Sequence, residues 1–219
     1  AGATHILLLN NDATISESDL QRLMGRLDAH PDLGILGPTL WDADAPEHLL
    51  SAGGRDIVRH LVSHLRELPA EGGVRFVEYV PGTCALIRAE ALRQVGLFDA
   101  DYFFGGEMAD LCARASQDGW ESTIDDDARA LHRVARSSHL RAQLHIYYVL
   151  RNRFLFIRKF YRRTRRRWML FWTVYGLYMA LLALAHRESR RARAILLGVI
   201  DGWRGRYGGQ NARVLGRES

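Results

Sequence analysis

Polar residues near the start of the chain are suited to holding a divalent cation. Asn10, Asn11 and Asp12 directly follow an apolar run at residues 5–9. Amide and carboxylate oxygens are ligands that Mg²⁺ and Mn²⁺ accept, and such an ion can bridge the phosphates of a diphosphate. Asparagine and aspartate are also common turn residues, so the triplet taken alone more often marks a simple chain reversal.

A second set of residues offers proton transfer. Glu107 and Asp110 lie one helical turn apart, directly after a Gly-Gly pair. A carboxylate there can act as general base on a hydroxyl group, although acids in a first helical turn also serve merely to offset the helix dipole. His132 follows a strand-like segment at 128–131 and is a feasible third ligand beside the Asn-x-Asp triplet, while a lone histidine is more often structural.

Apolar runs and helical periodicities indicate which elements position these residues. The run at 5–9 is typical of a buried, parallel-type strand that ends at the polar triplet. The further expected elements are a helix at 17–29 capped by Ser16, a short strand at 34–38 closed by proline, an irregular excursion at 41–73, strands at 75–80 and 83–87, a helix at 89–95, and a helix between Gly106 and Gly119. Strands that alternate with helices indicate an α/β fold class.

Charges of opposite sign are segregated along the chain. Residues 1–150 carry a net charge of −9, whereas residues 151–219 carry +14. An apolar content of 47% supplies a hydrophobic core for the 219 residues and excludes disorder for most of them. Cys84 and Cys112 lie in apolar segments and are expected to be reduced thiols in the cytoplasm.

The basic end contains an uncharged stretch, residues 168–185, beside the cluster Arg162–Arg167. As a helix this stretch would be roughly 27 Å long, near the thickness of a bilayer core, and its Trp and Tyr side chains suit the headgroup region. A helix in the membrane interface is therefore favoured over a membrane span or a protein core helix, with the arginines against anionic lipid. A nucleic-acid surface would also combine arginine with aromatic residues, but the uncharged stretch counts against it, so nucleic acid is not expected as a partner.

Several motifs follow one another in a consistent order. They are the apolar strand that ends in Asn-x-Asp at residue 12, and the segments at 80–92, 95–99, 102–114 and 119–120. Over about residues 4–160 this order resembles the family 2 glycosyltransferases, and most of all their rhamnosyltransferase-like branch. The resemblance implies a GT-A fold, a Rossmann-like domain with a mostly parallel sheet, in which a nucleotide-diphosphate sugar and Mg²⁺ or Mn²⁺ lie at the carboxyl ends of the strands.

The resemblance also implies roles for individual residues and for the tail. The cation would be held by Asn10, Asp12 and His132; the donor and acceptor pocket would be lined by Asn10, Asn11, Asp12, Pro81, Gly82, Thr83 and Cys84; and the base of an inverting transfer would be Glu107 or Asp110. Residues 1–139 would form the catalytic domain and residues 140–219 a helical, membrane-associated tail. The acceptor would be a lipid-linked sugar or polysaccharide of the cell envelope, at the cytoplasmic face of the membrane, with attachment either peripheral or through one inserted helix at 168–185.

Two departures from the family pattern bear on activity. Met108 stands where the family usually has an aspartate base, and because methionine cannot accept a proton, Glu107 is the preferred substitute. The family's first βα units have no counterpart before Asn10, so the chain is expected to be a fragment or to be completed by a partner, with an exposed apolar edge on the strand at 5–9. A degenerate or truncated homologue that binds membrane, and perhaps donor, without catalysis is the alternative to an active transferase.

Overall fold

The computed structural model describes residues 2–133 and 139–216. The chain divides into two compact units. The sheet unit comprises Ala1–Phe98 and Met108–Ala135, and the helical unit comprises Asp99–Glu107 and Arg136–Ser219. The domain boundary expected after residue 139 stays a prediction. One short segment, 99–107, belongs to the helical unit although it lies inside the sheet unit in sequence.

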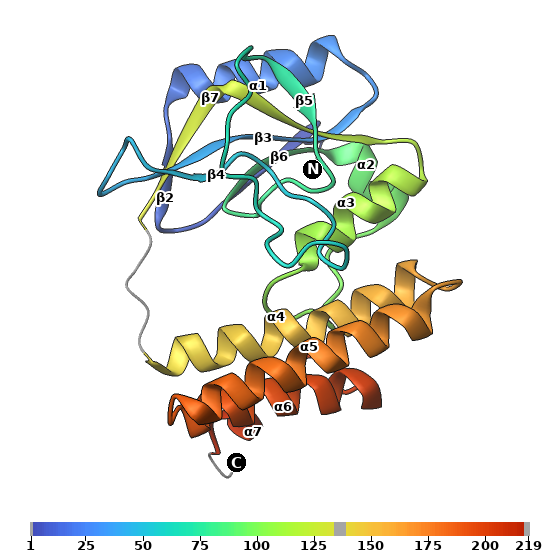
Figure 1. The fold of residues 1–219 in the computed structure, drawn as a ribbon. Helices are drawn as coiled ribbons and strands as arrows, with labels where there is room; N and C mark the ends of the chain where they lie inside the picture. Colours follow the sequence, from blue (N-terminus) through green and yellow to red (C-terminus); the bar gives the residue numbers. More distant parts are fainter. Residues whose placement is uncertain (1, 134–138, 217–219) are drawn as a thin grey trace. The chain divides into compact units, whose positions relative to one another are not determined.

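The sheet unit has the mixed α/β architecture that the sequence predicts (Figure 1). Its elements are β1 (His5–Leu9), β2 (Ala13–Ile15), α1 (Glu17–Ala29), β3 (Leu33–Asp42), β4 (Leu49–Ser51), β5 (Val74–Phe76), β6 (Cys84–Arg88), α2 (Ala89–Val95), α3 (Glu107–Gln117) and β7 (Glu121–His132). The strands form one sheet in the order β1-β6-β3-β7-β2, with β4 paired to β3 and β5 paired to β7.

The expectation of a mostly parallel sheet is wrong. Among the described strands, β3 and β7 form the only parallel ladder, and the other ladders are antiparallel. The reason is the position of β6, which lies between β1 and β3 and runs opposite to both. β1 and β3 therefore point the same way without being neighbours. Periodicity along one strand carries no information about which strand is inserted beside it.

β1 is also not the buried strand that its apolar run predicts. It pairs with β6 alone, in antiparallel register from His5 opposite Arg88 to Leu9 opposite Cys84. Ile6, Leu7 and Leu9 are 41%, 37% and 39% exposed, because no strand in the described part of the chain lies along the outer side of β1. A row of apolar side chains thus lies on an open sheet edge, as expected for this strand without further neighbours.

β3 runs through Pro38, where the sequence predicts that the strand ends. The ladder with β6 covers Ile35 and Leu36, and the register with β7 shifts between Pro38 and Thr39. Because the proline lies at this irregularity, its missing N–H removes no bond from a regular ladder. β3 therefore continues to Asp42 and reaches the carboxyl end of β7 at His132.

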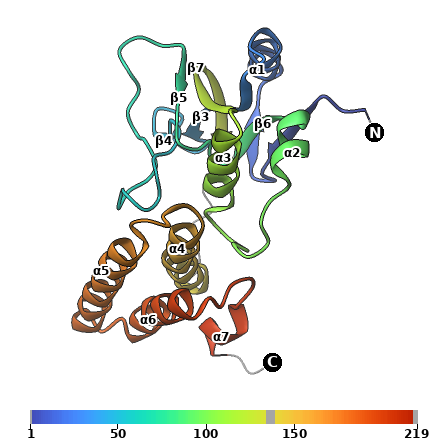
Figure 2. The same ribbon diagram turned by 90° about the vertical axis from the view of Figure 1, so that its right-hand side faces the viewer.

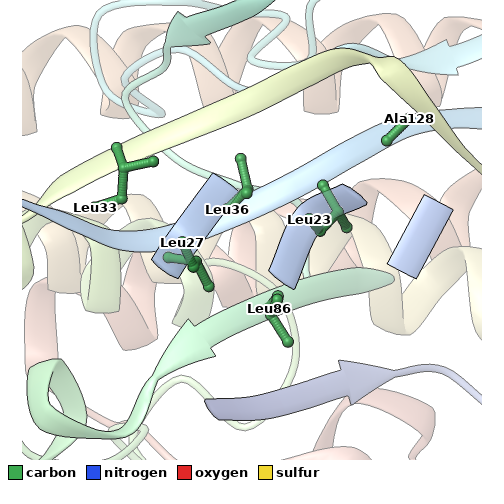
Figure 3. Close-up of a cluster of buried hydrophobic side chains, with 6 residues drawn as sticks. All are labelled: Leu23, Leu27, Leu33, Leu36, Leu86 and Ala128. Carbon is green, nitrogen blue, oxygen red and sulfur yellow. The ribbon is translucent and has the colours of Figure 1, made fainter. Parts of the chain in front are cut away.

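α1 covers one face of the sheet and contributes to its core (Figure 3). The helix begins where predicted, since the N–H of Asp19 donates to the Ser16 hydroxyl at 3.1 Å. Its buried side chains, Leu23 and Leu27, pack against a cluster contributed by β3, β6 and β7: Leu33, Leu36, Leu86 and Ala128. Each fully buried leucine stabilises the fold by ~1.5–3 kcal/mol.

The helical unit consists of α4 (His139–Phe160), α5 (Arg165–Ala185), α6 (Ser189–Arg204), α7 (Asn211–Leu215) and segment 99–107. α4, α5 and α6 pack side by side (Figure 2). Glycines of α6 permit this helix to approach α4 closely. A Cβ on Gly198 would lie 3.0 Å from the Tyr147 carbonyl oxygen, and one on Gly202 would lie 2.6 Å from the Phe154 ring.

α5 has two different faces. Trp172, one of the aromatic residues of the uncharged stretch, is buried against protein. The opposite face exposes large apolar side chains: Leu170, Phe171, Val174, Leu177, Tyr178 and Leu181. Among the described residues α5 is the one helix long and apolar enough to cross a membrane, with a mean hydropathy of 1.6 over its most apolar 18-residue window, of which 28% is buried.

Candidate functional site

The triplet Asn10–Asp12 forms the turn between β1 and β2. The backbone N–H of Asn10 donates to the carbonyl of Thr83 at 2.9 Å, and the N–H of Ala13 donates to the carbonyl of Asn10 at 3.1 Å. The triplet does reverse the chain, as the simpler interpretation proposes. The bond from Asn10 to Thr83 also brings the triplet against the segment at 81–84, for which the family resemblance implies donor and acceptor binding.

Asp12 and His132 meet at this end of the sheet. Ala13 pairs with His132 in the ladder between β2 and β7, and the N–H of Arg133 donates to the carbonyl of Asp12 at 2.9 Å. The Oδ1 atom of Asp12 consequently lies 3.2 Å from Nε2 of His132. The two side chains, 31% and 22% exposed, are thus brought together from positions 120 residues apart in sequence.

The pair has the chemistry of a cation site. Oδ1 of Asp12 is buried and makes no hydrogen bond of acceptable geometry within the described residues. Two ligands on one ion, each about 2.1 Å from it and at right angles, lie about 3 Å apart, which matches the separation of Oδ1 and Nε2. Across the described residues no three side chains of His, Cys, Asp or Glu gather as a metal-binding group. A cation here would need further ligands such as the Asn10 amide, phosphate oxygens or water.

The segment at 81–84 is only partly accessible. Pro81 and Cys84 are buried, whereas Gly82 and Thr83 are partly exposed beside the triplet. The thiol of Cys84 packs in an apolar cluster with Leu40 and Ala130. Burial raises the pKa of the Cys84 thiol to about 12, so it stays protonated at neutral pH. The accessible part of this segment is therefore the backbone of Gly82 and the residue Thr83.

Asp110 is held in a structural network. Its carboxylate is fully buried and accepts a hydrogen bond from Nε of Arg114 at 2.7 Å. The Arg114 guanidinium also donates to the carbonyls of Val95 and Leu97, next to the end of α2. This network favours the structural interpretation of Asp110 over that of a base.

Glu107 differs from Asp110 in its surroundings. It is the first residue of α3, and its Oε2 atom is buried with no hydrogen-bond partner in the part of the chain that the structure describes. The next residue, Met108, is 3% exposed and packs into the interior. An aspartate at position 108 would therefore be a buried carboxylate, and the role of Glu107 as proton acceptor stays a prediction.

Sequence reasoning missed Arg133. Its backbone N–H donates to the carbonyl of Asp12. Its side chain is 71% exposed, and the guanidinium lies 3.5 Å from the carboxylate of Asp44. The positively charged guanidinium of Arg133, directly after His132 in sequence, is suited to pairing with a phosphate group. Its place in the sequence could have indicated it, since Arg133 directly follows the candidate ligand His132 at a strand end and so lies at the same edge of the sheet.

Comparisons with known proteins bear on these features. No family model matches the chain. Two curated relatives, from Mycobacterium tuberculosis strains CDC 1551 / Oshkosh and ATCC 25618 / H37Rv, are each an N-acetylglucosaminyl-diphospho-decaprenol L-rhamnosyltransferase. Each is 27% identical over 214 residues, which covers 90% of this chain and 69% of the relative.

One solved structure shows the same fold, and a second was also found. The mannosyltransferase PcManGT from Pyrobaculum calidifontis, in complex with GDP-Man and Mn²⁺, aligns with a TM-score of 0.50 and 10% identity over 94% of this chain and 64% of its own. GalNAc-T7 with UDP, GalNAc and Mn²⁺ aligns with a TM-score of 0.49 and 15% identity over 68% of this chain and 31% of its own. The chain thus spans less than two thirds of either solved protein. With the relatives above, the resemblance drawn from the motifs is confirmed, and we identify the chain as a GT-A-fold glycosyltransferase similar to the rhamnosyltransferase-like branch of family 2.

Proposed function

We propose that the protein transfers a sugar, rhamnose or another hexose, with inversion, from a nucleotide-diphosphate donor to a lipid-linked or polysaccharide acceptor of the cell envelope. The observation that carries the proposal is the meeting of Asp12, His132 and Thr83 at one end of the sheet. The curated relatives support it, because they are transferases that act on a lipid-linked diphospho-sugar.

Asn10, Asp12 and His132 are the residues that would hold Mg²⁺ or Mn²⁺. Oδ1 of Asp12, which accepts no hydrogen bond of acceptable geometry within the described residues, lies 3.2 Å from Nε2 of His132, and this arrangement fits such an ion. When bound, the ion supplies positive charge that makes the diphosphate a better leaving group. Arg133 is placed beside Asp12 to pair with a phosphate, while Gly82 and Thr83 are the accessible part of the predicted donor segment.

Glu107 is the proposed base. Its carboxylate would take the proton of the acceptor hydroxyl as that oxygen attacks the anomeric carbon and the bond to the diphosphate breaks. One displacement of this kind inverts the anomeric centre. Asp110 has a weaker claim to this role, since Arg114 already engages its carboxylate.

A non-catalytic homologue is the second candidate, favoured by Met108 in the position of the usual aspartate. Such a protein would keep the cation and donor site and bind the membrane, but it would not accelerate transfer. The two candidates differ in what happens to bound donor, so a transfer assay separates them.

The test is transfer of radiolabelled sugar by the full-length protein. Nucleotide-linked rhamnose and hexoses are offered with Mn²⁺ or Mg²⁺ and an N-acetylglucosaminyl-diphospho-polyprenol acceptor. We expect acceptor-dependent transfer that stops on addition of EDTA and returns with excess Mn²⁺. Donor binding without transfer would support the non-catalytic candidate, and absence of both would contradict the proposal.

We also propose that the exposed face of α5 lies in the interface of an anionic membrane. One side of α5 is covered by α4 and α6, which suits a helix lying in the membrane plane better than one surrounded by lipid. Arg162, Arg163 and Arg165–Arg167 are exposed at its amino-terminal end. Each basic residue near an anionic surface contributes about 1 kcal/mol of attraction, and the apolar face adds the burial of its leucines.

The double variant Leu177→Glu/Leu181→Glu tests this surface. Because burying each leucine is worth ~1.5–3 kcal/mol, we expect binding to phosphatidylglycerol vesicles, measured by flotation, to fall at least about 10-fold. The matched control is Val62→Glu, which places an acid on an apolar side chain of the sheet unit that is 60% exposed. Equal losses in both variants, or none in the double variant, would contradict docking through α5.

A further inference from the structure

Arg151, on α4, is a fully buried arginine whose partners are mainly backbone carbonyls. Its guanidinium donates to the carbonyls of Asp101 at 2.9 Å, Tyr102 at 2.8 Å and Gly208 at 2.6 Å. It also donates to Oδ1 of Asn152. Burial lowers the pKa of Arg151, so its charge is kept in the interior at a cost. Because burying this charge costs free energy, the segment whose carbonyls Arg151 binds is expected to matter for function.

Asn152 holds the same segment. Its Nδ2 donates to the carbonyls of Tyr102 at 3.0 Å and Phe104 at 2.9 Å, and to that of Gly105. The carbonyls bound by Arg151 and Asn152 thus run almost continuously from residue 101 to residue 105. We call segment 99–107 the clamped loop.

The clamped loop has a backbone that needs external support. Phe103 has φ +58°, and Gly105 and Gly106 have φ +75° and +93°. A positive φ is unfavourable for a phenylalanine and persists only where surrounding contacts impose it. A Cβ on Gly106 would lie 3.1 Å from the Tyr102 ring and 3.6 Å from Cβ of Asn152, so the loop lies tightly against α4.

The chain after α6 covers the other side of the clamped loop. The N–H of Gly208 donates to the carbonyl of Asp101 at 2.9 Å, while its own carbonyl accepts from Arg151. A Cβ on Gly209 would lie 3.0 Å from the Phe103 ring. The glycines after α6 therefore permit contact that larger residues would prevent, and the loop is fixed from two directions.

The clamped loop ends at Glu107, the proposed base. Nδ2 of Asn152 binds the carbonyl of Gly105, two residues before it. The buried Oε2 of Glu107 has no hydrogen bond of its own within the described residues, so the backbone at the end of the clamped loop contributes to where the carboxylate lies. We infer that Arg151 and Asn152 are positioning residues that fix the Glu107 carboxylate for the acceptor hydroxyl. The inference rests on the proposed function and adds the residues that prepare its base.

The test compares variants of Arg151 and Asn152, which we call the clamp, with a variant of a matched arginine elsewhere in the helical unit. Asn152→Asp keeps an oxygen for Arg151 but loses the donors to the loop, and Arg151→Lys loses the forked guanidinium. The control is Arg193→Lys, because Arg193 also donates to backbone carbonyls, those of Val214 and Arg213, in the same unit. A base displaced by about 1 Å can cost about 10²-fold in rate. We therefore expect kcat to fall about 10²-fold in both clamp variants, with the donor KM within about twofold, and Arg193→Lys to keep the kcat of the wild type.

A second arm separates positioning from general stability. In a Glu107→Gln background the clamp substitutions should cause no further loss of kcat, since they act through that carboxylate. Losses of equal size in both backgrounds would overturn the inference. So would an unchanged kcat in Asn152→Asp.

Hydrogen exchange of the amides at 99–107 provides a readout without catalysis. We expect Asn152→Asp, but not Arg193→Lys, to accelerate it. Unchanged exchange overturns the clamp whatever the activity. Absence of transfer by the wild-type protein would instead overturn the proposed function, and with it the assignment of Glu107 as the group that is positioned.

Discussion

Replacing Glu107 by glutamine is expected to lower kcat for sugar transfer by about 10²–10⁴-fold, the usual contribution of a positioned general base. Glutamine has nearly the same shape but cannot take the acceptor proton. Donor affinity should stay within about twofold, because the cation and diphosphate are assigned to residues of the sheet unit. Single-turnover transfer with saturating acceptor, together with calorimetric donor binding, measures both quantities.

The control for this variant is Glu90→Gln. Glu90 lies in the first turn of α2 and is exposed, so its substitution removes the same favourable interaction with a helix dipole without touching a proposed site. Dipole interactions are worth about 0.3–1 kcal/mol and should leave kcat nearly unchanged. If Glu107→Gln behaves like Glu90→Gln, Glu107 is only a dipole partner and another group accepts the proton.

The helices were the most predictable part of the fold. Their signals are local: the cap at Ser16, the apolar spacing that places Leu23 and Leu27 on one face of α1, and Gly96 after α2. The helices begin and end at the residues that these signals predict. The sheet was less predictable. The direction of β6 between β1 and β3 depends on long-range pairing, and an apolar run such as that of β1 looks the same whether the strand is central or at an edge.

The candidate site shows the same division between local and long-range information. The Asn-x-Asp triplet, the glycine-containing segment before β6 and His132 could each be picked out by type and position, but their meeting depends on pairing between β2 and β7. The sequence favours Glu107 over Asp110 only weakly, because both are acids of one helical turn. The structure adds that Arg114 donates to Asp110, whereas Oε2 of Glu107 accepts no hydrogen bond within the described residues. Nothing in the sequence around Arg151 and Asn152 points to a loop some fifty residues earlier, so their contacts with it could not be predicted.

The other large effect is expected at the cation site. Asp12→Ala and His132→Ala should each raise the Mn²⁺ concentration needed for half-maximal binding of a nucleoside diphosphate by more than about 100-fold, because loss of a ligand exceeds the 10–100-fold cost usual for its outer partners. Titration of Mn²⁺ by electron paramagnetic resonance in the presence of a nucleoside diphosphate measures this without catalysis. The control is Asp44→Ala, which removes a 69% exposed carboxylate that pairs with Arg133.

The double variant Asp12→Ala/His132→Ala decides whether the two residues act on one ion. Their atoms lie 3.2 Å apart, so removal of either should leave the other unable to hold the ion alone, and the double variant should be little worse than each single one. Independent, additive losses would mean that each residue serves a separate role. Normal Mn²⁺ binding in His132→Ala would show that the histidine is structural and that the Asp12 carboxylate finds its further ligands among Asn10, the diphosphate and water.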